Sequence, residues 1–158
     1  RESDRADGTV EENTLQDSDL AWVMELGERD LLIVDSSHVL KTGSDLWWLF
    51  DRVLPNLAKG VWIHFHDVPW PFEYPREWVD AGRAWNEAYA LRLFLQFNRA
   101  FAVRFHLTHV LSRDPEELRK GLGLEHDLAT AMPPGVPPAT VARLVAEPGS
   151  ACWIERVG

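Results

Sequence analysis

The sequence predicts an α/β domain built on a sheet with parallel strands. Two short apolar runs, residues 31–34 (LLIV) and 61–63 (VWI), each end abruptly in carboxylate and imidazole groups. Buried parallel strands have such continuous apolar runs, and they carry polar side chains to their carboxyl ends. The segment between the runs has the apolar spacing of a helix. A strand, a helix and a second strand form a right-handed crossover in which the strands are parallel.

Composition limits the class of protein. The chain has 158 residues, of which 46% are hydrophobic and 8 are Trp, which is enough for one domain with a real core, residues 1–158. Its net charge of −9, with the basic residues scattered, argues against nucleic-acid binding. No apolar run approaches the ~20 residues needed to cross a bilayer, and the single Cys152 cannot form an internal disulfide. We therefore expect a soluble, cytoplasmic protein with no membrane contact.

Each element has a local signal. Strands are predicted where short β-branched and aromatic runs stand between turn residues, at 30–35, 60–66, 101–111 and 150–157. Helices are predicted where apolar residues recur at helical spacing, at 19–26, 45–54, 85–97 and 114–121. Gly27 ends the first helix, Ser44 or Asp45 caps the second, and Pro55 ends it. Asp114 begins the last helix, because proline and two acidic residues follow it.

Two segments are predicted to lack regular structure. Residues 69–78 alternate prolines with aromatic side chains. The aromatic loop from Trp70 to Trp85 is either a lid over the strand tips or a segment whose aromatic side chains pack in the core and between helix and sheet. Residues 133–138 (PPGVPP) form a rigid linker. The tryptophans are expected to serve mostly in the core, Trp47, Trp62 and Trp153 among them.

Asp35 and His38 directly follow the first strand, in the sequence DSSH. The chain turns there, so both side chains can face one crevice at the edge of the sheet. In the functional interpretation, the carboxylate holds a metal and the imidazole takes a proton. In the structural interpretation, Asp35 and Ser36 cap a turn and His38 is an ordinary polar residue. The two residues alone leave both interpretations open.

The second strand ends in the sequence HFHD, residues 64–67. The period of two puts His64 and His66 on one face of the strand and Phe65 on the other. Two imidazoles and a carboxylate suit iron or zinc, whereas Asp35 with Asp67 suits magnesium or manganese. His64 lies within the strand, where a histidine more often belongs to the core. His66 and Asp67, at the tip, are the better candidate ligands.

Three segments in order, IVDSSHVLKTGSDL, GVWIHFHDVPWPFEYPREW and WNEAYALRLFLQFN, resemble the C-terminal half of class I S-adenosylmethionine-dependent methyltransferases. The resemblance is to a branch that includes metal-assisted O-methyltransferases of natural-product and glycan pathways. It implies a Rossmann-like methyltransferase sheet in which Asp35 ends the fourth strand and Asp67 follows the fifth. The family's glycine-rich turn and ribose-binding acid have no match in this sequence. We therefore expect a sheet that lacks its first two strands, and a chain that is the C-terminal part of such a domain.

The resemblance also assigns roles. It implies O-methyl transfer from S-adenosylmethionine to a hydroxyl of a small molecule or sugar. His38 matches the position proposed as general base in macrolide-sugar O-methyltransferases of this type, and Asp17 falls where the adenine of the cofactor would lie. Asp35, His66 and Asp67 would hold a divalent metal, Mg²⁺ or Mn²⁺. Relatives with a metal site carry an acidic residue at the position of His66.

Two other functions stay open. A metal-dependent hydrolase would use Asp35, His64, His66 and Asp67 to activate water, and it would hold zinc or iron tightly. A domain without catalytic activity would instead pair with another chain, or with a second copy of itself, through the sheet edge left by the missing strands. The same exposed edge makes a homo-oligomer an expectation of the methyltransferase interpretation.

Overall fold

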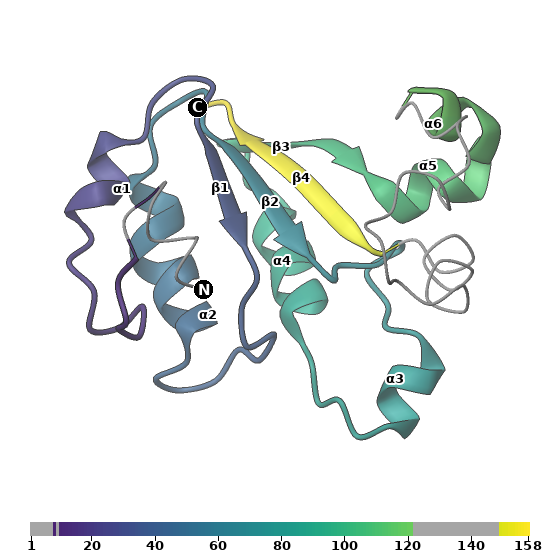
Figure 1. Cartoon of the computed structure of the whole chain (residues 1–158), viewed down its shortest axis with the longest axis horizontal. Helices are drawn as coiled ribbons and strands as arrows, with labels where there is room; N and C mark the ends of the chain where they lie inside the picture. The colour runs from purple at the N-terminus through teal and green to yellow at the C-terminus, as the bar shows by residue number, and fades with distance from the viewer. Residues whose placement is uncertain (1–7, 9, 122–148) are drawn as a thin grey trace.

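The structure is a computed structural model and describes residues 8, 10–121 and 149–158. These residues form a mixed α/β fold around an open four-stranded sheet in the order β1, β2, β4, β3 (Figure 1). The strands are β1 (Leu31–Val34), β2 (Trp62–His66), β3 (Phe101–His106) and β4 (Ala151–Arg156). The helices are α1 (Ala21–Glu25), α2 (Asp45–Trp48), α3 (Arg76–Asp80), α4 (Glu87–Leu95), α5 (Leu107–Arg113) and α6 (Pro115–Gly121). A π-helix, η1 (Leu49–Val53), and a 3₁₀ turn, η2 (Leu54–Asn56), continue α2.

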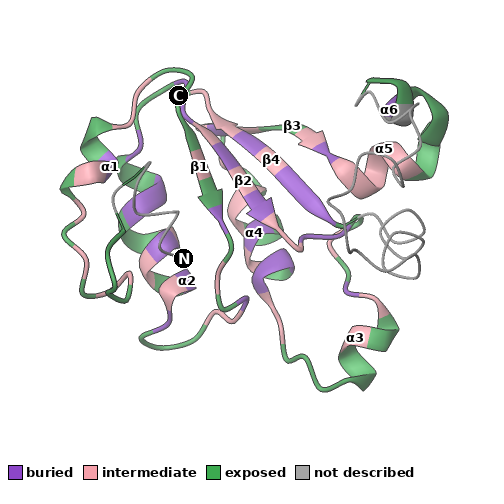
Figure 2. Ribbon diagram, viewed as in Figure 1, coloured by how far each residue is buried: buried purple, intermediate pink, exposed green. Residues whose placement is uncertain are grey.

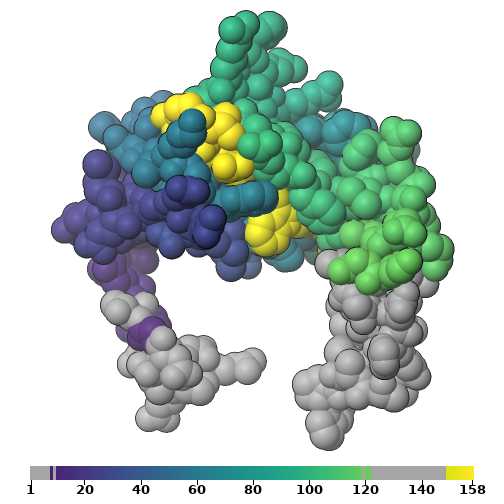
Figure 3. Space-filling view, turned by 90° about the horizontal axis from the view of Figure 1, so that it is seen from above, coloured from purple at the N-terminus to yellow at the C-terminus, as the bar shows by residue number. Residues whose placement is uncertain are grey.

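The pairing of β1 and β2 is parallel, which confirms the predicted crossover unit. In their register Leu31 pairs with Trp62, and Val34 pairs with Phe65. β4 runs antiparallel between β2 and β3. Figure 3 accordingly shows the yellow C-terminal residues between the purple and blue segments and the green ones. Within the described part of the chain, β1 has a partner strand on one side, and its other edge is open.

The core lies on one face of the sheet. Ile63 and Phe65 of β2 have no exposed surface. They pack against side chains from α4 and from the crossover helix, by which we mean α2 together with η1 and η2. These side chains are Leu46, Leu49, Val53, Leu54, Ala88 and Leu91. On the opposite face, which we call the front face, Ile33 is 62% exposed, and Trp62 and His64 are half-buried. Figure 2 shows the resulting contrast between β1, which has exposed residues drawn in green, and β2 and β4, which are drawn in purple and pink.

Two helices begin at the predicted caps, whereas α1, for which Ser18 or Asp19 was the predicted cap, has Leu20 at its N-cap position and no capping bond from that side chain. The Oγ of Ser44 accepts the N–H of Trp47 at 3.2 Å and so caps α2. The Oδ1 of Asp114 accepts the N–H of Glu117 at 3.2 Å at the start of α6. These side chains replace the intrahelical partners that the first N–H groups of a helix lack.

The crossover helix departs from the predicted regular helix over 45–54. Pro55 has no N–H, and its ring clashes with the carbonyl four residues earlier. The N–H of Leu54 instead bonds to the carbonyl of Leu49, five residues back, which makes the last full turn a π-helix. The prediction that Trp47 is a core residue is wrong, because Leu46 and Leu49 occupy the face toward the sheet and Trp47 is 48% exposed.

The prediction of a strand over 101–111 is wrong in its length, because the strand is shorter. β3 ends at His106, which pairs with Cys152 next to the first residue of β4, and α5 begins directly afterwards. A helix satisfies its own N–H and C=O groups, so the chain can leave the sheet there without leaving its backbone unpaired. The segment 69–78, predicted to be irregular, contains the start of α3. The linker at 133–138 lies outside the described residues. None of the described helices is long and apolar enough to cross a membrane.

Candidate functional site

The candidate site lies at the carboxyl ends of β1 and β2, where the chain turns sharply. His38 and Asp67, one after each strand, have left-handed backbone conformations, with φ of 58° and 53°. Such conformations cost about 1–3 kcal/mol and persist only where surrounding contacts hold them. Both strand tips are therefore shaped by the tertiary structure around them.

His38 is buried among acidic and aromatic side chains. Its Nδ1 lies 2.6 Å from Oε2 of Glu87, and its Nε2 lies 3.7 Å from Oδ1 of Asp35. The ring of Trp85 lies against the imidazole, with centroids 4.1 Å apart. The hydrogen bond with Glu87 is the main cause that raises the pKa of His38, whereas burial lowers it. The charges of Glu87, Asp67 and Asp35 raise this pKa as well.

Glu87 is the site residue that the sequence analysis missed. It lies in the first turn of α4 and has no exposed surface. Burial raises its pKa, and the hydrogen bond and charge of His38 lower it. An acidic residue in a first helical turn is an ordinary feature, because it interacts favourably with the helix dipole. Its burial against His38 depends on how α4 packs, and no local pattern in the sequence indicates that.

The loop after β1 is hydrogen-bonded to the start of α4. The carbonyl of His38 accepts the N–H of Asn86 at 3.0 Å and that of Glu87 at 3.3 Å. The side chain of Asn86 accepts the N–H of Leu40 at 2.6 Å and donates to the Leu40 carbonyl at 3.1 Å. These four bonds fix His38 relative to the helix that carries Glu87.

The three predicted metal ligands do not gather into one group. The side chain of Asp35 is 69% exposed and faces His38, while His66 and Asp67 form a separate pair, with Nε2 and Oδ1 3.8 Å apart. Across the described ranges, no group of three or more His, Cys, Asp and Glu is close enough to hold a metal ion. The described residues therefore do not fit a metal centre.

His64 and His66 lie on the front face, and their ring centroids are 6.0 Å apart. Phe65 points to the opposite face and has no exposed surface. His64 stacks on Trp153 of β4, with centroids 4.5 Å apart. Burial lowers the pKa of His64, His66 lowers it further, and Asp35 raises it. His64 is therefore a packed side chain of the sheet rather than a group at the strand tip.

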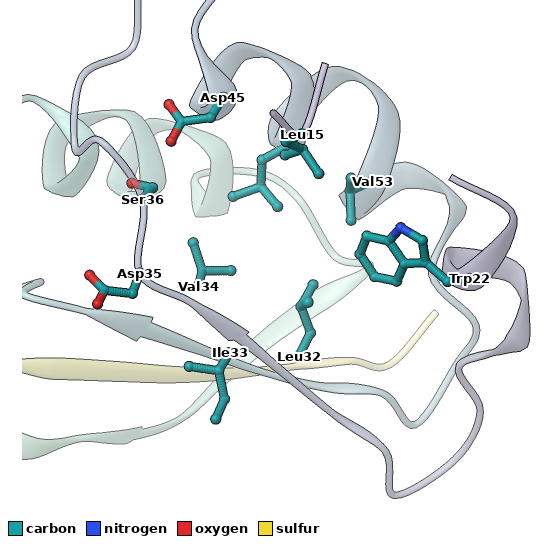
Figure 4. A pocket seen from close by; sticks show the side chains of 10 residues that line it. Leu15, Trp22, Leu32, Ile33, Val34, Asp35, Ser36, Asp45 and Val53 are labelled. Carbon is teal, nitrogen blue, oxygen red and sulfur yellow. The ribbon is translucent and has the colours of Figure 1, made fainter. Parts of the chain in front are cut away.

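An apolar cavity of about 250 Å³ lies beside β1 (Figure 4). Its walls come from the N-terminal segment, from β1 and from the crossover helix: Leu15, Trp22, Leu32, Ile33, Val34, Leu49 and Val53. Asp35, Ser36 and Asp45 lie at one end of the cavity and Trp22 at the other. The cavity thus reaches the carboxyl end of β1, the strand that His38 follows.

Asp17, the predicted cofactor contact, lies in a turn before α1. Thr14 donates its hydroxyl to the Asp17 carboxylate at 2.7 Å. The neighbouring Gln16 donates to the carbonyl of Gly43 at 2.7 Å, which ties this turn to the loop after β1. Leu15 lines the cavity beside β1, whereas Asp17 does not.

Comparison with known proteins assigns no family or function to this chain. No family model, no curated protein and no solved structure matches this chain. The arrangement that bears on function is therefore the site itself: an imidazole with one ring nitrogen engaged, an exposed carboxylate next to the other, and an apolar cavity at the same edge.

Proposed function

We propose that this chain forms the acceptor side of an S-adenosylmethionine-dependent O-methyltransferase of the class I type. The observation that carries the proposal is His38, whose Nδ1 is engaged by Glu87 and whose Nε2 faces Asp35 at the carboxyl edge of a parallel strand pair. In open α/β sheets, ligands bind at this edge. An imidazole with one nitrogen oriented and the other free is suited to act as a general base.

In this proposal the residues of the site act on the hydroxyl of the acceptor. S-adenosylmethionine, when bound, supplies the methyl group of its sulfonium. His38 takes the hydroxyl proton at Nε2, and the carboxylate of Asp35 stabilises the imidazolium that results. Trp85 covers one face of the ring and excludes water from it. Proton removal by such a base contributes about 10²–10⁴-fold to the rate.

The cavity and the open edge of β1 support the same proposal. Apolar walls around Leu15 and Leu32 suit a flat aromatic base, and the resemblance assigns the segment at Leu15 to the adenine. The resemblance also makes β1 the fourth strand of the family's sheet, which pairs with the first. Leu31 and Ile33 of β1 are 44% and 62% exposed. In the proposed enzyme, a strand paired with this edge would hold the methionine end of the cofactor.

The test is methyl transfer by the protein expressed from its whole reading frame. Methyl-labelled S-adenosylmethionine is supplied with a panel of hydroxyl-bearing small molecules and sugars, and labelled product is measured. His38→Ala should lower turnover by roughly 10²–10⁴-fold, because the base is lost. Lys59→Ala, at an exposed turn before β2, is the control and should leave turnover unchanged. Chelation followed by addition of Mg²⁺ or Mn²⁺ tests whether a metal assists.

Two outcomes would contradict the proposal. Full activity of His38→Ala across the neutral and alkaline range would remove the general base. With the chain of 158 residues, calorimetry should detect weak or no binding of S-adenosylmethionine, since the glycine-rich turn has no match in this sequence. A micromolar or tighter dissociation constant would contradict the assignment of cofactor contacts to a strand beyond β1.

A second candidate function is a domain that binds a partner strand. It is favoured by the open edge of β1 and by the exposed apolar side chains of Leu31 and Ile33. Light scattering at increasing protein concentration distinguishes the two. A stable oligomer that shows no methyl transfer would favour the binding domain, whereas an active monomer would exclude it.

A further inference from the structure

Glu87 is a carboxylic acid buried at the start of α4. Burying a carboxylate is costly unless hydrogen bonds or opposite charge compensate for the lost hydration. Its Oε2 lies 2.6 Å from Nδ1 of His38, and its Oε1 has no hydrogen-bond partner among the described residues. Within this part of the chain, His38 is thus the main group that compensates for the burial of Glu87, with a smaller contribution from Ser36.

The imidazole of His38 is held from three directions. Glu87 engages Nδ1, and Trp85 lies against the ring. The backbone carbonyl of His38 accepts the N–H groups of Asn86 and Glu87, and these bonds maintain the left-handed φ of 58°. The remaining ring nitrogen, Nε2, lies 3.7 Å from Asp35, which is too long for a hydrogen bond. Nε2 is therefore the free edge of the ring.

We propose that Glu87 is a positioning residue, which accepts the Nδ1–H of His38 and so holds the neutral imidazole in the tautomer that leaves Nε2 unprotonated. The hydrogen bond between the two side chains is the main cause that raises the pKa of His38, and the same bond acts against the rise that burial causes in the pKa of Glu87; both effects favour the proton on nitrogen. The hydrogen bond made by one ring nitrogen determines whether the other carries a proton. The role of Nε2 as a proton acceptor in methyl transfer rests on the proposed function, whereas the assignment of the tautomer does not depend on that function.

The proposal gives Glu87 a specific effect on chemistry. In water, a neutral histidine side chain favours the opposite tautomer, with the proton on Nε2. That tautomer could donate a hydrogen bond at the strand tip but could not accept a proton there. The bond to Glu87 reverses this preference and makes Nε2 the proton acceptor beside Asp35.

The test is a nitrogen-15 NMR spectrum of the chain with labelled histidine, recorded in alkaline buffer where imidazole is neutral. In the wild type, His38 should show a protonated Nδ1 and an unprotonated Nε2. His38→Gln identifies the signals. An Nε2–H tautomer in the wild type would overturn the proposal, because Glu87 would then be the donor of the bond.

Two variants remove the carboxylate in different ways. Glu87→Gln is isosteric, and its amide can donate to Nδ1 as well as accept from it, so the single tautomer should give way to a mixture. Glu87→Leu deletes the polar group and should do the same. Glu73→Gln is the matched control, because Glu73 is exposed and accepts from the hydroxyl of Tyr89 instead. Should Glu87→Leu fail to fold, Glu87→Gln decides. A wild-type tautomer pattern in folded Glu87→Gln or Glu87→Leu would overturn the proposal.

An activity measurement separates this inference from the proposed function. In a protein that transfers methyl groups, Glu87→Leu should lower kcat by roughly 10²-fold with KM nearly unchanged, because the base is misoriented. In a His38→Ala background the same substitution should cost nothing further. An additional loss in that background would overturn the positioning role. If His38 keeps a protonated Nδ1 and an unprotonated Nε2 but the protein transfers no methyl group, the positioning role of Glu87 stands and only the proposed function is rejected.

Discussion

Two isoleucines on neighbouring strands make the burial pattern of the sheet testable. Ile63 of β2 has no exposed surface and packs in the core, whereas Ile33 of β1 is 62% exposed on the front face. Both lie inside strands, β1 at the edge of the sheet and β2 in its interior, and the effect of a substitution in a strand depends mainly on how far its side chain is packed and buried. The difference between Ile63→Ala and Ile33→Ala in the free energy of unfolding therefore reports burial.

The expected magnitudes follow from the exposed fractions. Truncating a fully buried Ile to Ala costs about 2–5 kcal/mol, because contacts are lost and a cavity remains. Burying a whole side chain of this kind is worth about 1.5–3 kcal/mol relative to leaving it exposed. Ile33 has less than half of that burial to lose, so Ile33→Ala should cost about 1 kcal/mol or less. The two variants should differ by about 1–4 kcal/mol.

The assay is equilibrium unfolding in urea, followed by circular dichroism at two protein concentrations. An equal loss of stability in the two variants would refute the reasoning, because the front face would then be covered in solution. A midpoint that rises with protein concentration would identify the cover as a second copy of the chain. A large difference between the two variants is the expected result.

Two further predictions concern pH and backbone geometry. Burial, with a smaller contribution from His109, lowers the pKa of His106 from 6.5 to about 4, so between these pH values the unfolded chain binds more protons than the native chain. The free energy of unfolding should therefore fall as pH drops through this window. Thermal melts of His106→Phe, whose side chain cannot titrate, should show a smaller loss of stability over the same pH range. An equal loss in the wild type and the variant would contradict the role of His106. Gly60→Ala should destabilise more than Gly43→Ala, although both glycines have positive φ, because a Cβ at Gly60 would lie 2.6 Å from Cγ of Glu28 while the position at Gly43 is open. Equal urea midpoints for the two glycine variants would contradict this expectation.

The parts of the fold that were predictable depend on interactions between near neighbours in the chain. The cap at Ser44 joins residues three apart, and the apolar runs of β1 and β2 identify buried strands wherever they pair. The same runs located Asp35, His38, His66 and Asp67 at strand ends. Local patterns failed at the end of β3: the strand predicted over 101–111 stops at His106, where the chain turns into α5.

The sequence by itself determined which polar groups follow the two parallel strands, since strand ends and side-chain alternation are local properties of the backbone. Only the tertiary structure decided which of these groups meet. It joined His38 to Glu87, 49 positions further along the chain, and within the described residues it left Asp35, His66 and Asp67 without the close grouping that a metal ion needs. The physical reason is packing: α4 brings Glu87 to His38 through the burial of Ala88 and Leu91 against the sheet, and that burial is a property of the whole core.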